Sequence, residues 1–167
     1  MRIIGGKYRS RAIEMPKGVD VRPTQDKVRE ALFNILASRI EGANVLDLYA
    51  ASGALGLEAL SRGARKAVFV DNHPRCVVAI KKNLEVLNIG EDSSAIINGD
   101  AIKALKALEA LNEKFNLVFI DPPYYRQMAK NCLINIARYD ILAPIHRIIA
   151  EHHKKDEISG INGILSC

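Results

Sequence analysis

Short apolar runs alternate along the chain with segments whose apolar residues recur at helical spacing, and this alternation constrains the fold most. We expect strands at residues 44–48, 66–71, 95–98, 115–120 and 147–150. We expect helices at residues 24–40, 53–62, 74–88, 101–111 and 126–142. Strands that alternate with helices favour an α/β fold, a mostly parallel central sheet with helices on both faces.

Local signals indicate where some helices begin and end. Thr24 is the expected N-cap of the first helix, whose apolar residues are Val28, Leu32, Ile35 and Leu36. Gly63 closes the second helix, and Pro74 stands at the first turn of the third. The last helix carries Met128, Cys132, Ile136 and Tyr139 at the same spacing.

Acidic residues recur where the expected strands end. They are Asp47, Asp71, Asp100, Asp121 and Glu151. In parallel sheets, ligands bind outside the carboxyl ends of the strands, so this series predicts a ligand site there. A single acid at a helix start is usually a cap, and Asp100 taken alone fits a cap as well as it fits a ligand contact.

The first motif runs from Asp47 to Gly56 with the sequence DLYAASGALG. Its small residues allow a ligand to approach the backbone, and the helix that follows presents free N–H groups. The motif lacks the first glycine of the G-x-G-x-x-G dinucleotide fingerprint. A nicotinamide-binding protein stays open on this motif alone, because Asp71 lies 18 positions after Gly53.

The second motif is Asp121-Pro122-Pro123-Tyr124, directly after an apolar run. Two prolines set an extended backbone, so carbonyl groups and the Asp121 carboxylate can accept hydrogen bonds from an exocyclic amine. Tyr124 offers a face on which a base can stack. Acceptors beside a stacking face are what methyl transfer to a base amine requires, and this motif therefore favours a methyltransferase.

With both motifs, the chain resembles the class I S-adenosylmethionine-dependent methyltransferases that modify amino groups. More narrowly, it is similar to the RsmD-like family, the bacterial small-subunit (16S) ribosomal RNA guanine-N2 methyltransferases. The matching segments are residues 2–8, 22–24, 29–36, 47–64, 70–72 and 119–124. The resemblance implies a Rossmann-like fold and a domain over residues 19–167 that uses S-adenosylmethionine.

The resemblance also implies roles for individual residues. Asp47 and the turn through Gly53 and Gly56 would hold the methionine end of the cofactor, Asp71 the ribose and Asp100 the adenine amine. The full cofactor-binding set is Arg22, Thr24, Phe33, Asp47, Tyr49, Ala51, Ser52, Gly53, Gly56, Asp71, Asn72, Asp100 and Ala101. Asp121, Pro122 and Tyr124 would hold the target guanine and form the catalytic set.

Two features depart from the family pattern. Ala51 stands where the family has glycine, so a methyl group there would crowd the cofactor or require a backbone angle that alanine disfavours. The segment after Glu151 differs from the family's last strand pair, and we expect shortened C-terminal strands. These departures keep open a catalytically weakened or inactive RNA-binding module of the same fold.

The net charge of +5 lies entirely in the first 29 of the 167 residues, which hold eight bases and three acids. We expect residues 1–18 to form a basic arm built as a β-hairpin, with its turn near Gly5-Gly6-Lys7. The arm residues expected to contact RNA phosphates are Arg2, Lys7, Arg9, Arg11 and Lys17. A solvated basic tail is the other interpretation of this charge.

Composition limits the remaining classes. No window approaches the roughly 20 apolar residues of a membrane span, and we expect no membrane partner. The three cysteines show no CxxC pair or metal spacing, so we expect no metal and a reduced cytoplasmic setting. The expected partner is 16S ribosomal RNA in an assembling or assembled small subunit, bound by a monomer. An amino-directed DNA methyltransferase is the other enzymatic alternative, for which the length leaves little room.

Overall fold

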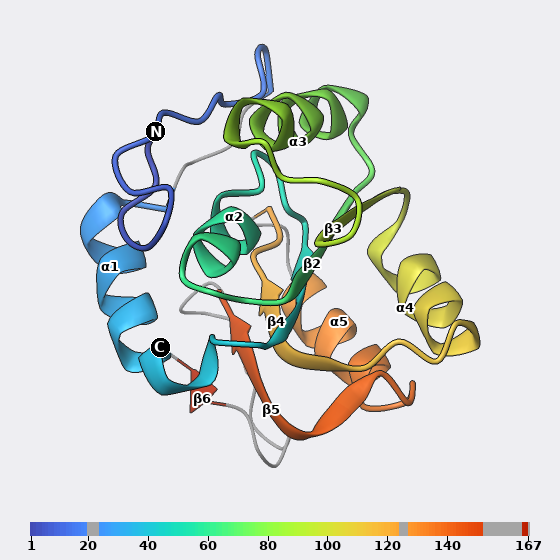
Figure 1. Ribbon diagram of the computed structural model, residues 1–167. Coiled ribbons are helices and arrows are strands. Elements are labelled where there is room, and N and C mark those ends of the chain that lie inside the picture. Colours follow the sequence, from blue (N-terminus) through green and yellow to red (C-terminus); the bar gives the residue numbers. More distant parts are fainter. Residues whose placement is uncertain (20–23, 124–126, 152–164, 167) are drawn as a thin grey trace.

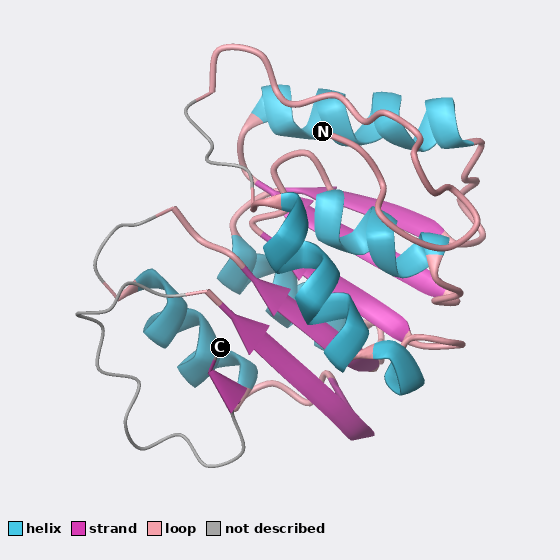
Figure 2. Ribbon diagram, turned by 90° about the vertical axis from the view of Figure 1, so that its left-hand side faces the viewer, coloured by secondary structure: helices cyan, strands magenta, loops and turns pink. Residues whose placement is uncertain are grey.

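Six strands form one sheet in the computed structural model, which describes residues 1–19, 24–123, 127–151 and 165–166. The strands are β1 (Asn44–Leu48), β2 (Lys66–Asp71), β3 (Ser94–Asn98), β4 (Phe115–Ile120), β5 (Leu142–Ala150) and β6 (Leu165–Ser166). Their order is β3-β2-β1-β4-β5-β6, and every pair of described strands is parallel. This arrangement confirms the expected Rossmann-like α/β fold, and Figure 2 shows the strands side by side between the helices.

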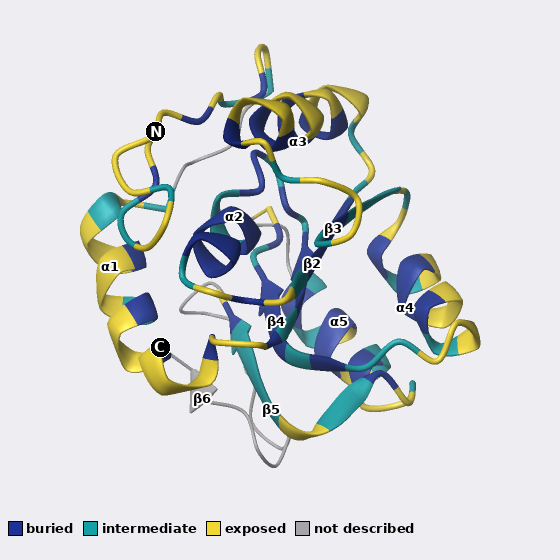
Figure 3. Cartoon of the chain, in the orientation of Figure 1, coloured by how far each residue is buried: buried dark blue, intermediate teal, exposed yellow. Residues whose placement is uncertain are grey.

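Helices cover both faces of the sheet (Figure 1). They are α1 (Asp26–Ile35), α2 (Ala54–Ser61), α3 (Pro74–Leu87), α4 (Ala101–Ala110) and α5 (Met128–Ile136), with a short 3₁₀ helix at Ala37–Arg39. Successive strand residues point to opposite faces, so they enter two different apolar clusters. Phe69 and Phe119 pack with α1, α2 and α3, whereas Val68 and Val118 pack with α4 and α5. Figure 3 shows α2 as buried along nearly its whole length.

The first helix differs from the sequence expectation. Gln25, rather than Thr24, occupies the N-cap position, and the α-helix ends at Ile35. Its buried side consists of Arg29, Phe33 and Leu36, while Val28 is 55% exposed and Ile35 is 71% exposed. The apolar pattern misplaced the buried side because an arginine occupies a core-facing position, where acidic partners compensate its charge.

The α5–β5 boundary also differs from the expected one. The helix ends at Ile136, so Tyr139 lies in the following turn, and β5 begins at Leu142 rather than at Arg147. The pairing of β4 with β5 shifts its register between Phe115 and Leu117, because Phe115 pairs with Leu142 whereas Leu117 pairs with Arg147. The strand β5 therefore includes residues before Arg147, although its apolar pattern there is irregular. The expected shortening of the C-terminal strands falls mostly outside the described residues. The described part contains β6, which adds two residues parallel to β5.

The N-terminal segment folds back on itself but is not a ladder of paired strands. A single antiparallel bridge joins Arg2 to Ala12, and the Ile13 N–H donates to the Met1 carbonyl at 3.0 Å. The segment therefore turns back antiparallel as expected of a β-hairpin, with its pairing confined to this short stretch. Ile3 and Ile13 are buried in the same apolar cluster as α2, which anchors the segment on the sheet domain. Among the described residues, no helix has the length and apolar character needed to cross a bilayer.

Candidate functional site

The loop after β1 is held in an unusual backbone conformation. Tyr49, Ala51 and Gly53 have φ angles of 61°, 50° and 78°, so every second residue is left-handed. Such angles suit glycine and cost alanine about 1–2 kcal/mol. The Ala51 N–H donates to Asp71 Oδ2 at 2.9 Å, and this bond helps to keep the loop in place. The structure thus confirms that the alanine occupies a backbone angle that its type disfavours.

Asp47, the acid of β1, organises the start of α2. Its buried carboxylate accepts the Gly56 N–H at 2.9 Å. Burial raises the pKa of Asp47 to about 8, and the nearby charges of Asp121 and Asp71 act in the same direction. A side chain at Gly56 would collide with the ring of Phe69, so only glycine lets α2 approach the sheet this closely.

Asp71, the acid of β2, lies beside the same loop. Its Oδ1 accepts the His73 N–H at 2.8 Å, while Oδ2 accepts that of Ala51. Each carboxylate oxygen has a second lone pair, which leaves acceptor capacity for a ligand diol. The next residue, Asn72, is exposed at this edge.

Asp100 follows β3 and caps α4, because its carboxylate accepts the Lys103 N–H at 3.0 Å. Its side chain is exposed at the same edge of the sheet, whereas Ala101 behind it is buried. The capping role is therefore observed, and it leaves the exposed carboxylate able to accept further hydrogen bonds.

Asp121 follows β4, between the ends of β1 and β5. Its neighbour there is Glu151, because Ile120 pairs with Ala150 and the Glu151 N–H donates to the Ile120 carbonyl at 2.8 Å. The pKa of Asp121 is raised to about 7, mainly by burial and in part by the charge of Glu151 and the hydrogen bond between the two carboxyl groups. The Thr24 hydroxyl lies 3.5 Å from Asp121 Oδ2 and lowers the pKa.

The other predicted site residues take different positions. Pro122 is buried beside Asp121, and Ser52 is buried in the loop after β1. Phe33 lies in the core, with its ring centroid 5.8 Å from that of Phe119, and its predicted role in the cofactor pocket stays a prediction. Arg22 and Tyr124 lie outside the described residues, so their predicted roles stay predictions.

Asn83 of α3 links the N-terminal segment to the loop after β1. Its amide Nδ2 donates to the Ser52 carbonyl at 2.9 Å and to the Glu14 carbonyl at 3.0 Å, and its Oδ1 accepts the Glu14 N–H at 2.7 Å. The sequence offered one signal for this residue, a polar side chain on the apolar face of an amphipathic helix.

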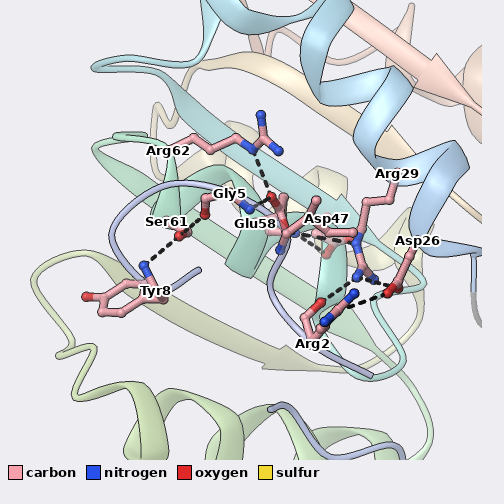
Figure 4. Close-up of polar contacts among 11 residues, drawn as sticks. Arg2, Gly5, Tyr8, Asp26, Arg29, Asp47, Glu58, Ser61 and Arg62 are labelled. Carbon is pink, nitrogen blue, oxygen red and sulfur yellow. Dashed lines mark hydrogen bonds and ion pairs between the residues drawn. The ribbon is translucent and has the colours of Figure 1, made fainter. Parts of the chain in front are cut away.

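Glu58 of α2 joins three parts of the chain, as Figure 4 shows. Its buried carboxylate accepts the N–H groups of Ile4 and Gly5, both at 2.8 Å. The same carboxylate accepts Nε of Arg62 at 2.8 Å and lies 3.9 Å from Nε of Arg29. Four positive or donor groups from the N-terminal segment, α1 and the end of α2 thus meet on one acid that lies two residues after Gly56.

The five basic residues expected to bind RNA are all exposed. Two of them also have partners within the protein: Arg2 lies 3.5 Å from Asp26, and Arg11 donates to the Val86 carbonyl at 2.7 Å. The ammonium of Lys7 lies 5.2 Å from the ring centre of Tyr8. Within the described ranges, His, Cys, Asp and Glu side chains form no cluster of three that could hold a metal ion.

Known proteins are similar to this chain in both sequence and fold. The family model described as "Conserved hypothetical protein 95" matches residues 1–166. The ribosomal RNA small subunit methyltransferase D of Haemophilus influenzae is 34% identical over 92% of this chain and 79% of its own length. The Escherichia coli K12 protein of the same name is 40% identical, over 80% of this chain and 65% of its own length.

A solved structure agrees with the sequence comparison. It is that of a hypothetical protein of Thermus thermphillus, with a TM-score of 0.81 at 30% identity, over 91% of this chain and 85% of that chain. The family model spans nearly all of the sequence, and the Haemophilus relative is matched over most of its length. This chain therefore belongs to the conserved hypothetical protein 95 family, that of the RsmD-like methyltransferases.

Proposed function

We propose that this protein transfers a methyl group from S-adenosylmethionine to the exocyclic N2 amine of a guanine in small-subunit (16S) ribosomal RNA. The position of Asp121 carries the proposal, because this residue lies at the carboxyl edge of the sheet, between the loop after β1 and Glu151. The names of the relatives, ribosomal RNA small subunit methyltransferase D, support the RNA substrate.

The residues present fit the proposed cofactor, whose sulfonium supplies an electrophilic methyl group. The loop between Tyr49 and Gly53 is held partly in the left-handed conformation, and its small side chains after Tyr49 would leave room for the methionine portion. The Asp71 carboxylate keeps lone pairs for the two ribose hydroxyls, and the exposed Asp100 carboxylate lies at the next strand end. Carboxylates at this edge also complement a cationic sulfonium.

The chain's own contribution to the reaction is mainly alignment. Asp121 and the Pro122 carbonyl would accept the hydrogens of the guanine amine, which holds its nitrogen in line with the methyl group. The raised pKa of Asp121, about 7, also suits a group that takes the amine proton after transfer, because efficient acid–base groups titrate near the working pH.

Ala51 favours an active enzyme over an inactive module. The alanine occupies its left-handed conformation and donates to Asp71, so the loop is formed despite the substitution. The exposed, positively charged side chains of Arg2, Lys7 and Arg9 fit contacts with phosphate groups, which position RNA without selecting a sequence. Arg11 and Lys17 complete that proposed set.

The experiment is transfer of a labelled methyl group to naked 16S ribosomal RNA, to assembled small subunits and to duplex DNA. Digestion of the product to nucleosides identifies the modified base. We expect N2-methylguanosine from one of the ribosomal RNA substrates. Label on DNA alone would favour the amino-directed DNA enzyme. No transfer, together with RNA binding, would favour the inactive module.

A further inference from the structure

We propose that a groove between residues 14–18 and α3 binds one nucleotide of the RNA, outside the candidate active site. The inference rests on the proposed function in taking RNA as the partner. The groove has a volume of about 520 Å³, and its lining includes Met15, Lys17, Arg75, Val78 and Lys82. Apart from Lys17, which is in the predicted RNA-binding set, none of these residues belongs to a predicted site.

The floor of the groove is apolar and open. Met15, Pro16, Pro74 and Ala79 contribute to it, together with Val78, which is 63% exposed in the second turn of α3. A flat base can cover such a surface without regard to its identity, because every base has an apolar face.

Hydrogen bonds fix the loop of residues 14–18 to α3 at both ends of the groove. The Arg75 guanidinium donates to the carbonyls of Lys17 and Gly18 at 3.3 and 3.2 Å, which fastens the loop to α3. Gly18 has a φ of 66°, and a side chain there would collide with this guanidinium. Asn83 fixes the other end through its two hydrogen bonds to the backbone of Glu14. Both walls are therefore held in place before a ligand binds.

The rim of the groove carries excess positive charge. Lys17, Arg75 and Lys82 face one acid, Glu14, which pairs with Lys82 at 2.6 Å. The net positive charge of these four side chains complements a phosphate group. Arg11 extends the positive charge along α3, since its guanidinium donates to the Val86 carbonyl. An apolar floor beneath a basic rim fits one nucleotide, with its base on the floor and its phosphate at the rim.

The position of the groove fits a nucleotide that neighbours the target. Pro74 lies three residues after Asp71, so the groove opens beside the edge where the strand acids gather. Through Asn83, its wall is connected to the Ser52 carbonyl of the loop after β1. RNA held there would run from the N-terminal segment toward the candidate active site.

The test compares two exposed valines. Val78→Asp places a carboxylate on the groove floor, and Val28→Asp places one on α1, where the valine is 55% exposed. Both sites are exposed, so both variants should fold, which circular dichroism checks. We expect Val78→Asp to weaken binding of transcribed 16S ribosomal RNA about tenfold, and Val28→Asp to change it less than about twofold. Calorimetry should give wild-type affinity for S-adenosylmethionine in both.

A further variant tests the rim. Lys17→Gln should reduce the slope of log affinity against log salt by about one, as the loss of one phosphate contact does. Wild-type RNA binding by Val78→Asp would overturn the proposal, and so would a loss confined to cofactor affinity, which would assign the groove to the cofactor site. Because RNA binding is measured without turnover, a weakened Val78→Asp variant supports the groove even if the wild type methylates no RNA.

Discussion

Asp71 holds Ala51 in a left-handed conformation through a hydrogen bond of 2.9 Å from the alanine N–H to Oδ2. The acid that ends β2 thereby shapes the loop that follows β1. Two strand ends thus form one structural unit, and the cofactor site proposed there depends on both.

Ala51→Gly should stabilise the protein. Glycine removes a left-handed alanine, and part of that gain is offset by the greater freedom of glycine in the unfolded chain, so the free energy of unfolding should rise by about 0.5–1 kcal/mol. Denaturant unfolding measures this change. Ala50→Gly is the matched control at a buried neighbour without positive φ, and it should lower stability. A free energy of unfolding lower in Ala51→Gly than in the wild type would contradict the claim that the left-handed conformation of Ala51 is strained.

Gly56→Ala should be destabilising by about 2 kcal/mol, since the added methyl group would collide with the Phe69 ring and move α2 away from Asp47. Gly90→Ala is the control, because nothing lies within 4 Å of a side chain added at Gly90. Thermal unfolding of both variants provides the comparison. Equal melting temperatures would show that α2 can shift without cost.

Glu58→Gln should lower the free energy of unfolding by about 3 kcal/mol, because it leaves the buried Arg29 without its second acidic partner. It should also loosen the N-terminal segment, whose Ile4 and Gly5 N–H groups bind this carboxylate. Limited proteolysis and denaturant unfolding measure the two effects. Glu85→Gln, at an exposed position of α3, should change neither.

The pH dependence of methyl transfer should report on Asp121. Only its ionised form can take a proton, so the rate should rise as pH increases through the pKa of about 7. Glu151→Gln removes a neighbouring negative charge, which lowers that pKa and moves the rise to lower pH. Asp47, the other nearby acid with a raised pKa, titrates near pH 8 and is present in both proteins.

Single-turnover rates at saturating cofactor and RNA, measured on both sides of neutral pH, give this profile. Asp92→Asn changes an exposed acid just before β3, at the opposite edge of the sheet from Asp121, and should leave the profile as in the wild type. An unchanged inflection in Glu151→Gln would show that Glu151 does not set the pKa of Asp121.

The sequence predicted the sheet well because its signals are local. Apolar runs of strand length define β2 and β4, and the acids Asp71 and Asp121 lie at one edge as a parallel sheet requires. Asp47 is buried one residue before the end of β1. Pro74 correctly marked the start of α3.

The interactions that hold the site together were not predictable in the same way. Glu58 and Arg29 look like surface charges on helices, and only tertiary contacts between segments distant in the sequence bury them. Phe33 and Arg29 form the buried side of α1, and the apolar pattern did not predict this rotation of the helix because an arginine faces inward. Hydropathy patterns do not anticipate a buried, compensated charge.

The most direct test of the proposed mechanism is the effect of Asp121→Ala on methyl transfer and on cofactor affinity, measured with the same preparation. Loss of the group that aligns the guanine amine should reduce the single-turnover rate on 16S ribosomal RNA by at least about 10²-fold. The affinity for S-adenosylmethionine, measured by calorimetry, should stay within about threefold of the wild-type value, because the cofactor contacts assigned to Asp71 and Asp100 remain. Methyl transfer near the wild-type rate in this variant would contradict the assignment of Asp121 and the function proposed from it.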